Sequence, residues 1–370
     1  MYFDNNASTR PDTKVLACMQ EYSAGNFGNP SSSHSYGRKA KAALEKARAH
    51  VARLIGAGER EIVFTSGGTE SNNLGISGFC GKRKSGHVIS ALTEHKSVTA
   101  SLHRLEEEGR EITWLPVSRG GLIDPDDLQT AIRPDTVLVS LMLANGETGV
   151  IQPVGEVGRI CRERGIRFHC DAVQAIRKIK VDVKELQVDS LSLSSHKIYG
   201  PQGVGALYLK DGLSLEPLLV GGPHEGKRRS GTENVPGIVG FGEACRLALE
   251  EGPVSGRLTA YLYEEIKKSV SGVALNGNRQ ASLPQTLNLS FEGMDNASLL
   301  IALDQEGVAV STGSACMAGS LAPSSVLLAS GFSEERAKSA IRFSLGKDNT
   351  RKEVATLVGM LQRLIPRIRG

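Results

Sequence analysis

The chain has 370 residues, of which 40% are hydrophobic and 23% are charged, and its formal net charge at pH 7 is +4. This composition is typical of globular proteins, and the length suggests two domains, or one large and one small unit. The basic residues are spread along the chain, no apolar run approaches the roughly 18 residues of a membrane span, and the amino terminus lacks the layout of a signal peptide. We therefore expect a cytoplasmic protein that binds neither nucleic acid nor a membrane.

From about residue 40 to residue 250, apolar strand candidates alternate with amphipathic helix candidates. The predicted helices include 95–109 and 154–165, where apolar residues recur at intervals of three and four. Such alternation is typical of a mostly parallel sheet with helices on both faces. The predicted strands are 61–66, 86–91, 111–117, 136–143, 166–172, 188–194 and 205–210.

The last third of the chain predicts a smaller α+β unit. Along the chain we expect two helices, a strand, a helix, two further strands separated by a loop, and a closing helix. These segments are 234–251, 257–270, 285–291, 297–307, 308–312, 340–345 and 351–365. We expect residues 15–250 to form a large domain, and residues 1–14 to join residues 251–370 in a small one.

Five of the predicted strands lead directly into polar or glycine-rich turns, namely "SGGTESNN", "TEHKS", "NGETG", "DAVQ" and "SSHK". In open α/β sheets, ligands bind beyond the carboxyl ends of the strands. Gly68 and Thr69 open a helix whose amino end favours a phosphate, although such turns also occur as plain connections. Asp171 would either cap a helix or meet a cation, and His95 would either stack on an aromatic ligand or serve the structure alone.

Lys197 follows a predicted strand and precedes a glycine-rich turn. By itself, a lysine in this position is as readily a solvated charge as a functional group. The neighbouring turns change that interpretation, because pyridoxal phosphate requires a lysine for its Schiff base, an Asp at its ring nitrogen and an anion site for its phosphate. Lys197, Asp171 and the turn at Gly68 supply these groups, so the sequence indicates a pyridoxal-phosphate site.

With these motifs in order, the chain resembles the cysteine desulfurases of the NifS and IscS kind, within the class V aminotransferase group of fold-type I pyridoxal-phosphate enzymes. The resemblance is carried by "YFDNNAST", "FGNPSSSHSYG", "FTSGGTESNN", "TEHKSV", "ANGETG", "HCDAVQ", "SSHKIYGPQGVGALY", "RRSGTENVPGIVG", "STGSACMAGSL" and "IRFSLG". It implies an α/β fold with a mostly parallel central sheet covered by helices, a smaller α+β domain, and a homodimer.

The resemblance also implies a role for each cofactor-binding residue. Lys197 would form the Schiff base and move a proton, Asp171 would keep the pyridine nitrogen protonated, and His95 would stack on the ring. Gln174 would donate a hydrogen bond to the phenolic oxygen. The phosphate would be held by Gly68, Thr69, Ser194 and His196, and by Thr232 across the dimer interface.

For the substrate, the resemblance implies that Asn145, beside the cofactor, and Arg342 bind the carboxylate of the amino acid. Cys316 would take the sulfur of L-cysteine as a persulfide and leave L-alanine. Its small polar neighbours in "STGSACMAGSLAPSS" predict an exposed loop rather than a core position. The six cysteines form no C-x-x-C pair, so we expect neither a metal site nor a disulfide framework. We assign core positions to the other cysteines, which are Cys18, Cys80, Cys161, Cys170 and Cys245.

The predicted function is an L-cysteine desulfurase that supplies persulfide sulfur to an iron–sulfur scaffold or another acceptor protein, for cluster assembly or thiolation. The sequence departs from the family at Gly146, where a second asparagine is common, at Met317, and in its short end "RIRG". The alternatives are another class V enzyme, such as an aminotransferase or selenocysteine lyase, which would not depend on Cys316, and a non-catalytic assembly module. Five intact residues argue against the module, namely Lys197, Asp171, His95, Arg342 and Cys316.

Overall fold

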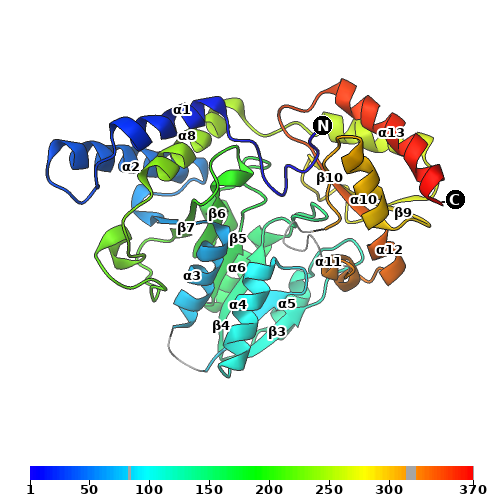
Figure 1. Ribbon diagram of the computed structural model, residues 1–370. Helices are drawn as coiled ribbons and strands as arrows, with labels where there is room; N and C mark the ends of the chain where they lie inside the picture. The colour runs from blue at the N-terminus through cyan, green and yellow to red at the C-terminus, as the bar shows by residue number, and fades with distance from the viewer. Residues whose placement is uncertain (82–84, 314–321, 370) are drawn as a thin grey trace.

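The computed structural model describes residues 1–81, 85–313 and 322–369, which form two β-sheets flanked by helices (Figure 1). The larger sheet has seven strands in the order β1-β7-β6-β5-β4-β2-β3, and the smaller has three in the order β10-β9-β8. The strands of the larger sheet are β1 (Ile62–Thr65), β2 (His87–Ala91), β3 (Glu111–Leu115), β4 (Thr136–Met142), β5 (Arg167–Asp171), β6 (Ser190–Ser194) and β7 (Gly205–Leu209).

The larger sheet is parallel from β6 through β5, β4 and β2 to β3, and β7 runs antiparallel to both of its neighbours, β6 and β1. The carboxyl ends of β1, β2, β4, β5 and β6 therefore meet at one edge. Each strand predicted between residues 61 and 210 is confirmed to within two residues at either end. The mostly parallel α/β fold is confirmed as well.

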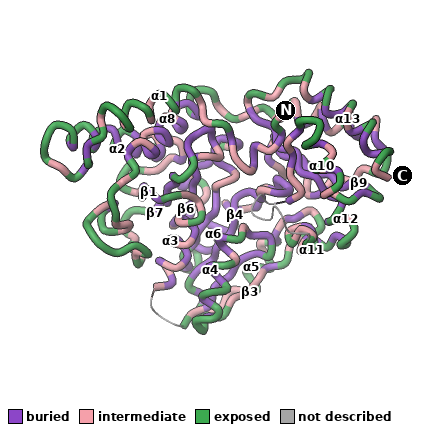
Figure 2. The backbone as a smooth tube through the Cα atoms, viewed as in Figure 1, coloured by how far each residue is buried: buried purple, intermediate pink, exposed green. Residues whose placement is uncertain are grey.

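Helices cover both faces of the larger sheet. On one face, α3 and α4 pack on apolar residues of β2 and β4; on the other, α6, α2 and α8 cover Val139, Phe168 and Leu191. Figure 2 shows the sheet as the buried centre of this part of the chain. The helices are α1 (Thr13–Gln20), α2 (Ser35–Leu54), α3 (Gly68–Cys80), α4 (Lys96–Glu107), α5 (Pro125–Ala131), α6 (Val154–Arg164), α7 (Val183–Leu186) and α8 (Val235–Glu251).

Local sequence signals set the ends of these helices. Asn234 caps α8 by accepting a hydrogen bond from Gly237 N, and Pro236 occupies the first turn, where its missing N–H costs nothing. Gly165 ends α6 in the left-handed conformation, with φ +67°. These caps explain why the predicted helix boundaries are close to the observed ones.

The smaller unit is an antiparallel sheet packed against helices on the right of Figure 1. Its core contains Phe3 from the amino-terminal segment, which pairs with the small sheet through Asp4 and Ser344. Its elements are α9 (Arg257–Ser269), β8 (Val273–Leu275), β9 (Thr286–Phe291), α10 (Asn296–Gln305), α11 (Ser325–Ala329), α12 (Glu334–Lys338), β10 (Ala340–Ser344) and α13 (Arg351–Arg369).

The predicted strand 308–312 is wrong as a continuous strand. The segment makes only single bridges, Ala309 with Tyr2 and Ser311 with Arg342, because its two partners lie in different segments and neither runs alongside it. The division into residues 15–250 and residues 1–14 with 251–370 stays a prediction, which the separate cores support. In the described ranges, none of the helices is long and apolar enough to cross a membrane.

Candidate active site

A cavity of ≈ 660 Å³ lies at the carboxyl edge of the larger sheet, where segments of the small unit also line it. Most of the predicted site residues border this cavity, although they come from distant parts of the sequence. They are Gly68, Thr69, His95, Asn145, Asp171, Gln174, Ser194, His196, Lys197 and Arg342. Thr232 is exposed and lines a separate small cavity beside Ser66. Cys316 lies outside the described residues.

Lys197 ends a short 3₁₀ turn, Ser195–Lys197, that follows β6 directly. Its side chain is half-buried, and Nζ donates to the carbonyl oxygens of Asn6 at 2.6 Å and Ala7 at 2.9 Å. The amino-terminal segment therefore lies against the lysine at the cavity wall. This geometry rejects a fully solvated charge and places a primary amine where a ligand would meet it.

Asp171 is the last residue of β5 and is only 6% exposed. Its Oδ1 accepts from Val173 N at 2.9 Å, and its Oδ2 accepts from Asn72 Nδ2 at 2.7 Å. Both donors are neutral, and a buried carboxylate is costly unless a cation compensates it. A protonated ring nitrogen fits this environment, so Asp171 is suited to the pyridine nitrogen of pyridoxal phosphate.

The start of α3 provides the predicted anion site. Gly67 caps the helix with φ +154°, and Gly68 passes so close to Val173 that an added Cβ would lie 2.7 Å from Cγ2 of that valine. Backbone N–H groups at a helix amino end bind anions well. Ser194, at the end of β6, lines the same part of the cavity wall. A phosphate fits this set of donors.

His196 lies beside this anion site. Burial, together with the nearby Lys197, lowers the pKa of His196 to about 4, so its ring is neutral at physiological pH. Its Nδ1 lies 3.2 Å from the hydroxyl of Ser8. A neutral imidazole can still donate one hydrogen bond to a phosphate, so His196 fits the group without adding a charge.

Gln174 lies between Lys178 and the amino-terminal segment. Its Oε1 accepts from Lys178 Nζ at 2.7 Å, and its Nε2 donates to the Asn6 carbonyl at 2.9 Å. Because the Asn6 carbonyl only accepts, the Gln174 Nε2 must face it, which leaves Oε1 to face Lys178. Burial lowers the pKa of Lys178 well below its ordinary value, and the positive charges of Lys197 and Arg342 add to this effect.

Arg342, in β10, brings a guanidinium from the small unit to the cavity. Its Nη2 pairs with Asp4 at 2.6 Å, its Nη1 donates to the Gly146 carbonyl at 3.0 Å, and its buried Nε has no partner among the described residues. A buried guanidinium with an unsatisfied N–H suits a carboxylate ligand. The predicted bidentate contact would share the group with Asp4.

Asn145 lines the cavity, but its amide shapes the turn after β4. Its Oδ1 accepts from Glu147 N and Thr148 N, both at 2.9 Å, and its Nδ2 donates to the Thr93 carbonyl at 3.0 Å. These contacts give Asn145 a structural role in this structure. They leave Arg342 as the better supported of the two predicted carboxylate ligands.

Gly146, in the same turn, is bonded by two side chains of the site. Its carbonyl accepts from Arg342 Nη1 and from Asn6 Nδ2, each at 3.0 Å. An added Cβ at Gly146 would lie 3.0 Å from Gln174 Nε2. A larger residue at this position would therefore require Gln174 to shift.

Sequence reasoning missed several polar groups at the cavity. Burial raises the pKa of Glu94 well above its ordinary value, and Asp171 adds to the shift. Burial also raises the pKa of Glu147. The other missed residues are Asn6, which contacts three side chains of the site, and Lys178. Asn6 lies in the family motif "YFDNNAST", which could have indicated it. The sequence does not indicate that the Asn6 carbonyl accepts hydrogen bonds from the site.

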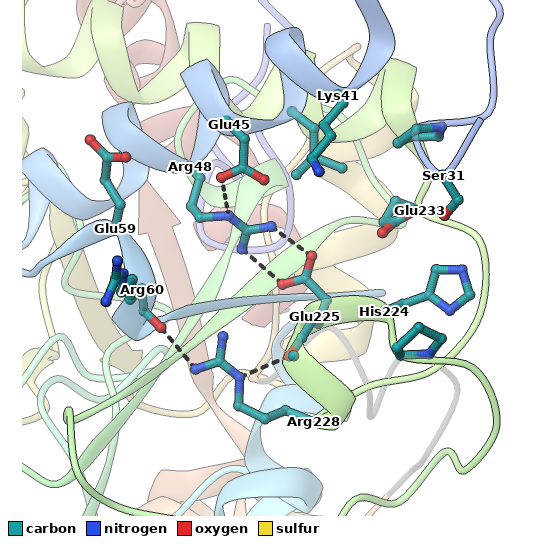
Figure 3. Close-up of a pocket in the computed structure, with 14 residues that line it drawn as sticks. Ser31, Lys41, Glu45, Arg48, Glu59, Arg60, His224, Glu225, Arg228 and Glu233 are labelled. Carbon is teal, nitrogen blue, oxygen red and sulfur yellow. Dashed lines mark hydrogen bonds and ion pairs between the residues drawn. The ribbon is translucent and has the colours of Figure 1, made fainter. Parts of the chain in front are cut away.

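A second cavity, of ≈ 640 Å³, lies between α2 and the short helix His224–Lys227 and is bordered by charged residues (Figure 3). Here Arg48 Nη1 and Nη2 bind the two carboxylate oxygens of Glu225 at 2.8 and 2.7 Å. Phe64 N donates to the same carboxylate at 2.8 Å. The charges of Arg48 and Glu225 are paired within the chain, so this ion pair is structural.

The described cysteines lack the properties of a nucleophile. All are free thiols, and burial raises the pKa of each. The pKa reaches about 11 for Cys80 and about 12 for Cys161. Core positions are confirmed for four of the five predicted cysteines, and wrong for Cys18, which is half-exposed because its face of α1 borders solvent.

Comparison with known proteins decides the family. The family described as Aminotransferase class-V matches residues 1–357. The chain belongs to this family. The resemblance stated from the sequence motifs is thereby confirmed over nearly the whole chain.

Relatives of this class V family member agree closely in length. A cysteine desulfurase IscS of Dictyoglomus turgidum is 47% identical over 375 residues, covering 100% of this chain and 95% of the relative. A solved structure named as a NifS-like protein superposes with a TM-score of 0.90 at 35% identity and covers 99% of both chains. Another, named as SspA in complex with cysteine, has a TM-score of 0.85 at 38% identity and covers 93% of this chain and 98% of its own.

Proposed function

We propose that this protein is a pyridoxal-phosphate-dependent L-cysteine desulfurase, which converts L-cysteine to L-alanine and keeps the sulfur as a persulfide on Cys316. The observation that carries the proposal is the single cavity where a strand-end lysine, a buried aspartate and an anion site meet. The full-length similarity to proteins named cysteine desulfurase supports this substrate over those of other class V enzymes.

The chain's own residues would hold the cofactor as follows. Lys197 would bind it covalently through Nζ, Asp171 would hold its protonated ring nitrogen, and His95 would lie against its ring. Gln174 would donate to the phenolic oxygen. The phosphate would be held by Gly68, Thr69, Ser194, His196 and, from the partner subunit, Thr232. When bound, pyridoxal phosphate supplies an electron sink that weakens bonds at Cα of the amino acid.

Arg342 would bind and orient the substrate carboxylate, and Asn145 would support it by holding the turn. Lys197 carries the amine that takes and returns a proton at the substrate. Overall, the Cβ–Sγ bond of L-cysteine breaks, an S–S bond to Cys316 forms, and the thiol proton of Cys316 is balanced by the new C–H bond of L-alanine. The raised thiol pKa values of the other cysteines favour Cys316 as the acceptor, since the thiolate is the nucleophile.

We also propose a homodimer, formed in a reducing compartment such as the cytoplasm, that passes its sulfur to an iron–sulfur scaffold or another acceptor protein. The free thiols are consistent with that compartment. Thr232 stands in an exposed loop that also carries Leu218, Leu219 and Val220, whose exposed apolar side chains suit an interface between copies. This arrangement would allow each Thr232 to complete the phosphate site of its partner.

The test of the function is turnover. Purified protein with pyridoxal phosphate, L-cysteine and a reductant should release alanine and sulfide in equal amounts over many turnovers. Lys197→Ala should lack the yellow colour of the bound cofactor. Cys316→Ser should keep the colour but release little sulfide, while the matched control Cys18→Ser stays active. A change of colour without alanine or sulfide would instead favour an aminotransferase.

The test of the dimer is complementation. We would mix Lys197→Ala with Thr232→Val in one heterodimer. If Thr232 acts across the interface, one of the two sites is intact and activity returns to about half that of the wild type. If Thr232 acts within its own chain, neither site is intact and no activity is recovered.

A further inference from the structure

Asn72, on α3, lines the cavity and is 1% exposed. Its Nδ2 donates to Asp171 Oδ2 at 2.7 Å and to Ser97 Oγ at 2.8 Å. Its Oδ1 lies 3.1 Å from His169 Nε2. One buried amide thus contacts Asp171, the predicted partner of the cofactor nitrogen, and is linked through Ser97 to His95, which caps α4.

Donor and acceptor chemistry fixes the direction of each bond in this network. The Asp171 carboxylate only accepts, so the NH₂ group of Asn72 must face it. The amide oxygen then faces His169, whose Nε2 must carry the proton while Nδ1 accepts from Ser190 Oγ at 2.8 Å. Burial lowers the pKa of His169 to about 3, so its ring is neutral and holds one proton only.

The second branch leads to His95. Because Ser97 Oγ accepts from Asn72, its own proton is available to His95 Nδ1, which lies 2.7 Å away. Ser97 N also donates to that Nδ1, at 3.1 Å. His95 Nδ1 is therefore an acceptor in this arrangement, and the neutral ring carries its proton on Nε2.

We propose that Asn72 is a positioning residue that orients both the Asp171 carboxylate and, through Ser97, the His95 ring. A single amide would then fix the orientation of two side chains. Asp171 would meet the ring nitrogen of the cofactor, and His95 would meet the face of the ring. The inference deepens the proposed function and rests on it for the identity of the cofactor. The network itself is made of the chain's own atoms and can be tested without turnover.

The neighbouring Asn73 provides a matched control. It belongs to the same helix, but its Nδ2 donates to the Thr69 carbonyl at 2.9 Å within α3 and makes no bond to Asp171 or Ser97 among the described contacts. Asn72→Leu and Asn73→Leu are the same chemical change at adjacent positions. Only the first removes the donor shared by the two branches.

The experiment uses two readouts on the full-length protein. The dissociation constant of pyridoxal phosphate reports the Asp171 branch, and the ¹⁵N spectrum of the His95 ring, assigned with His95→Gln, reports the other. We expect Asn72→Leu to raise the dissociation constant at least about tenfold and to change the His95 spectrum. Ser97→Ala should change the spectrum and should raise the dissociation constant by less than Asn72→Leu does, because the Asp171 branch remains. Asn73→Leu should change neither.

A double-mutant cycle tests the connection. In the Ser97→Ala background, Asn72→Leu should cause no further change in the His95 spectrum, because the link is already cut. The proposal is overturned if Asn72→Leu leaves both readouts as in the wild type, or if its effect on His95 persists without the Ser97 hydroxyl. If Asn72→Leu does not fold, as judged by thermal melting, Asn72→Ala and Ser97→Ala give the same comparison. Failure of the proposed function would appear as absent alanine and sulfide in the wild type, which leaves the His95 readout unaffected.

Discussion

Two buried carboxylates in this protein have opposite environments. Glu225, whose side chain is 2% exposed, accepts from both Nη atoms of Arg48 (Figure 3). It also accepts from the backbone N–H of Phe64. Asp171, 6% exposed, is bonded by Asn72 and by a backbone N–H, both of which are neutral. The first charge is compensated within the chain. The Asp171 carboxylate is stabilised only by neutral hydrogen-bond donors among the described contacts. Such an environment suits a ligand that brings a positive charge.

The difference separates charges that stabilise the fold from charges that serve a ligand. In a complete internal ion pair, loss of one partner leaves an uncompensated charge and reduces stability. Replacing the Asp171 carboxylate by a neutral group removes a cost of burial, so the free energy of unfolding should change little. The loss should appear in the activity instead. The predictions below test this distinction, from the largest expected effect to the smallest.

Arg48→Met should reduce the free energy of unfolding by about 3–5 kcal/mol, because it leaves Glu225 buried without its cation. Urea denaturation monitored by circular dichroism measures the change. The double variant with Glu225→Gln should recover much of the loss. If the double variant is as unstable as Arg48→Met, the buried charge is not the cause.

Asp171→Asn should lower the rate of alanine formation at least about 100-fold, since the neutral amide cannot hold a protonated ring nitrogen. The same change should alter the free energy of unfolding by less than about 2 kcal/mol, because the lost hydrogen bond is offset by removal of a buried charge. The rate of alanine formation is measured with pyridoxal phosphate bound. The free energy of unfolding is measured by urea denaturation of the cofactor-free protein. A loss of stability as large as that of Arg48→Met would contradict the comparison.

His169 should make the free energy of unfolding depend on pH in the acidic range. Because burial lowers its pKa to about 3, the unfolded state binds a proton between that value and its ordinary pKa of about 6.5, while the folded state does not. Stability therefore falls as the pH falls through this window, by about 1.4 kcal/mol per pH unit from this group. His169→Gln should lose correspondingly less between about pH 6 and pH 5 than the wild type does. If the variant and the wild type lose equal stability over this pH range, the His169 ring is protonated in the folded protein.

Arg159→Ala should change the free energy of unfolding by less than about 0.5 kcal/mol. Arg159 pairs with Glu163 at 2.8 Å on α6, but the two side chains are 50% and 59% exposed. Water already solvates both charges, so the geometry of the pair matters little. Thermal melting of the variant and the wild type measures the change in stability. A loss comparable to that of Arg48→Met would mean that burial does not determine how much an ion pair contributes to stability.

The parts of the fold predicted correctly from the sequence are those with a strong local signal. The strands of the larger sheet are short apolar runs bounded by turn residues, and each was found within two residues of its expected ends. Gly68, His95 and Lys197 follow β1, β2 and β6, and Asp171 ends β5. The parallel order of these strands brings the four residues to one cavity. The family motifs supplied the remaining cavity residues.

The predictions that failed or fell short concern contacts between distant segments. Segment 308–312 has the composition of a strand, yet its partners are single residues of two other segments. Cys18 has the apolar character of a core residue, but the face of α1 that it occupies is partly open. Asn6 attracted no role from its sequence, although its side chain and carbonyl contact Lys178 and Lys197 in the folded chain.

The amino-acid sequence by itself determined the alternation of strands and helices, the family, and the residue types of the site, because these depend on periodicity, turn chemistry and motif order within short stretches. Only the tertiary structure decided that the Arg342 guanidinium is shared with Asp4, that the Asn6 carbonyl orients Gln174, and that Asn72 joins two branches of one network. The physical reason is that hydrogen-bond direction and desolvation depend on which atoms are brought together in three dimensions. Residues more than 300 positions apart, such as Asp4 and Arg342, meet because the amino-terminal segment pairs with β10 of the small sheet.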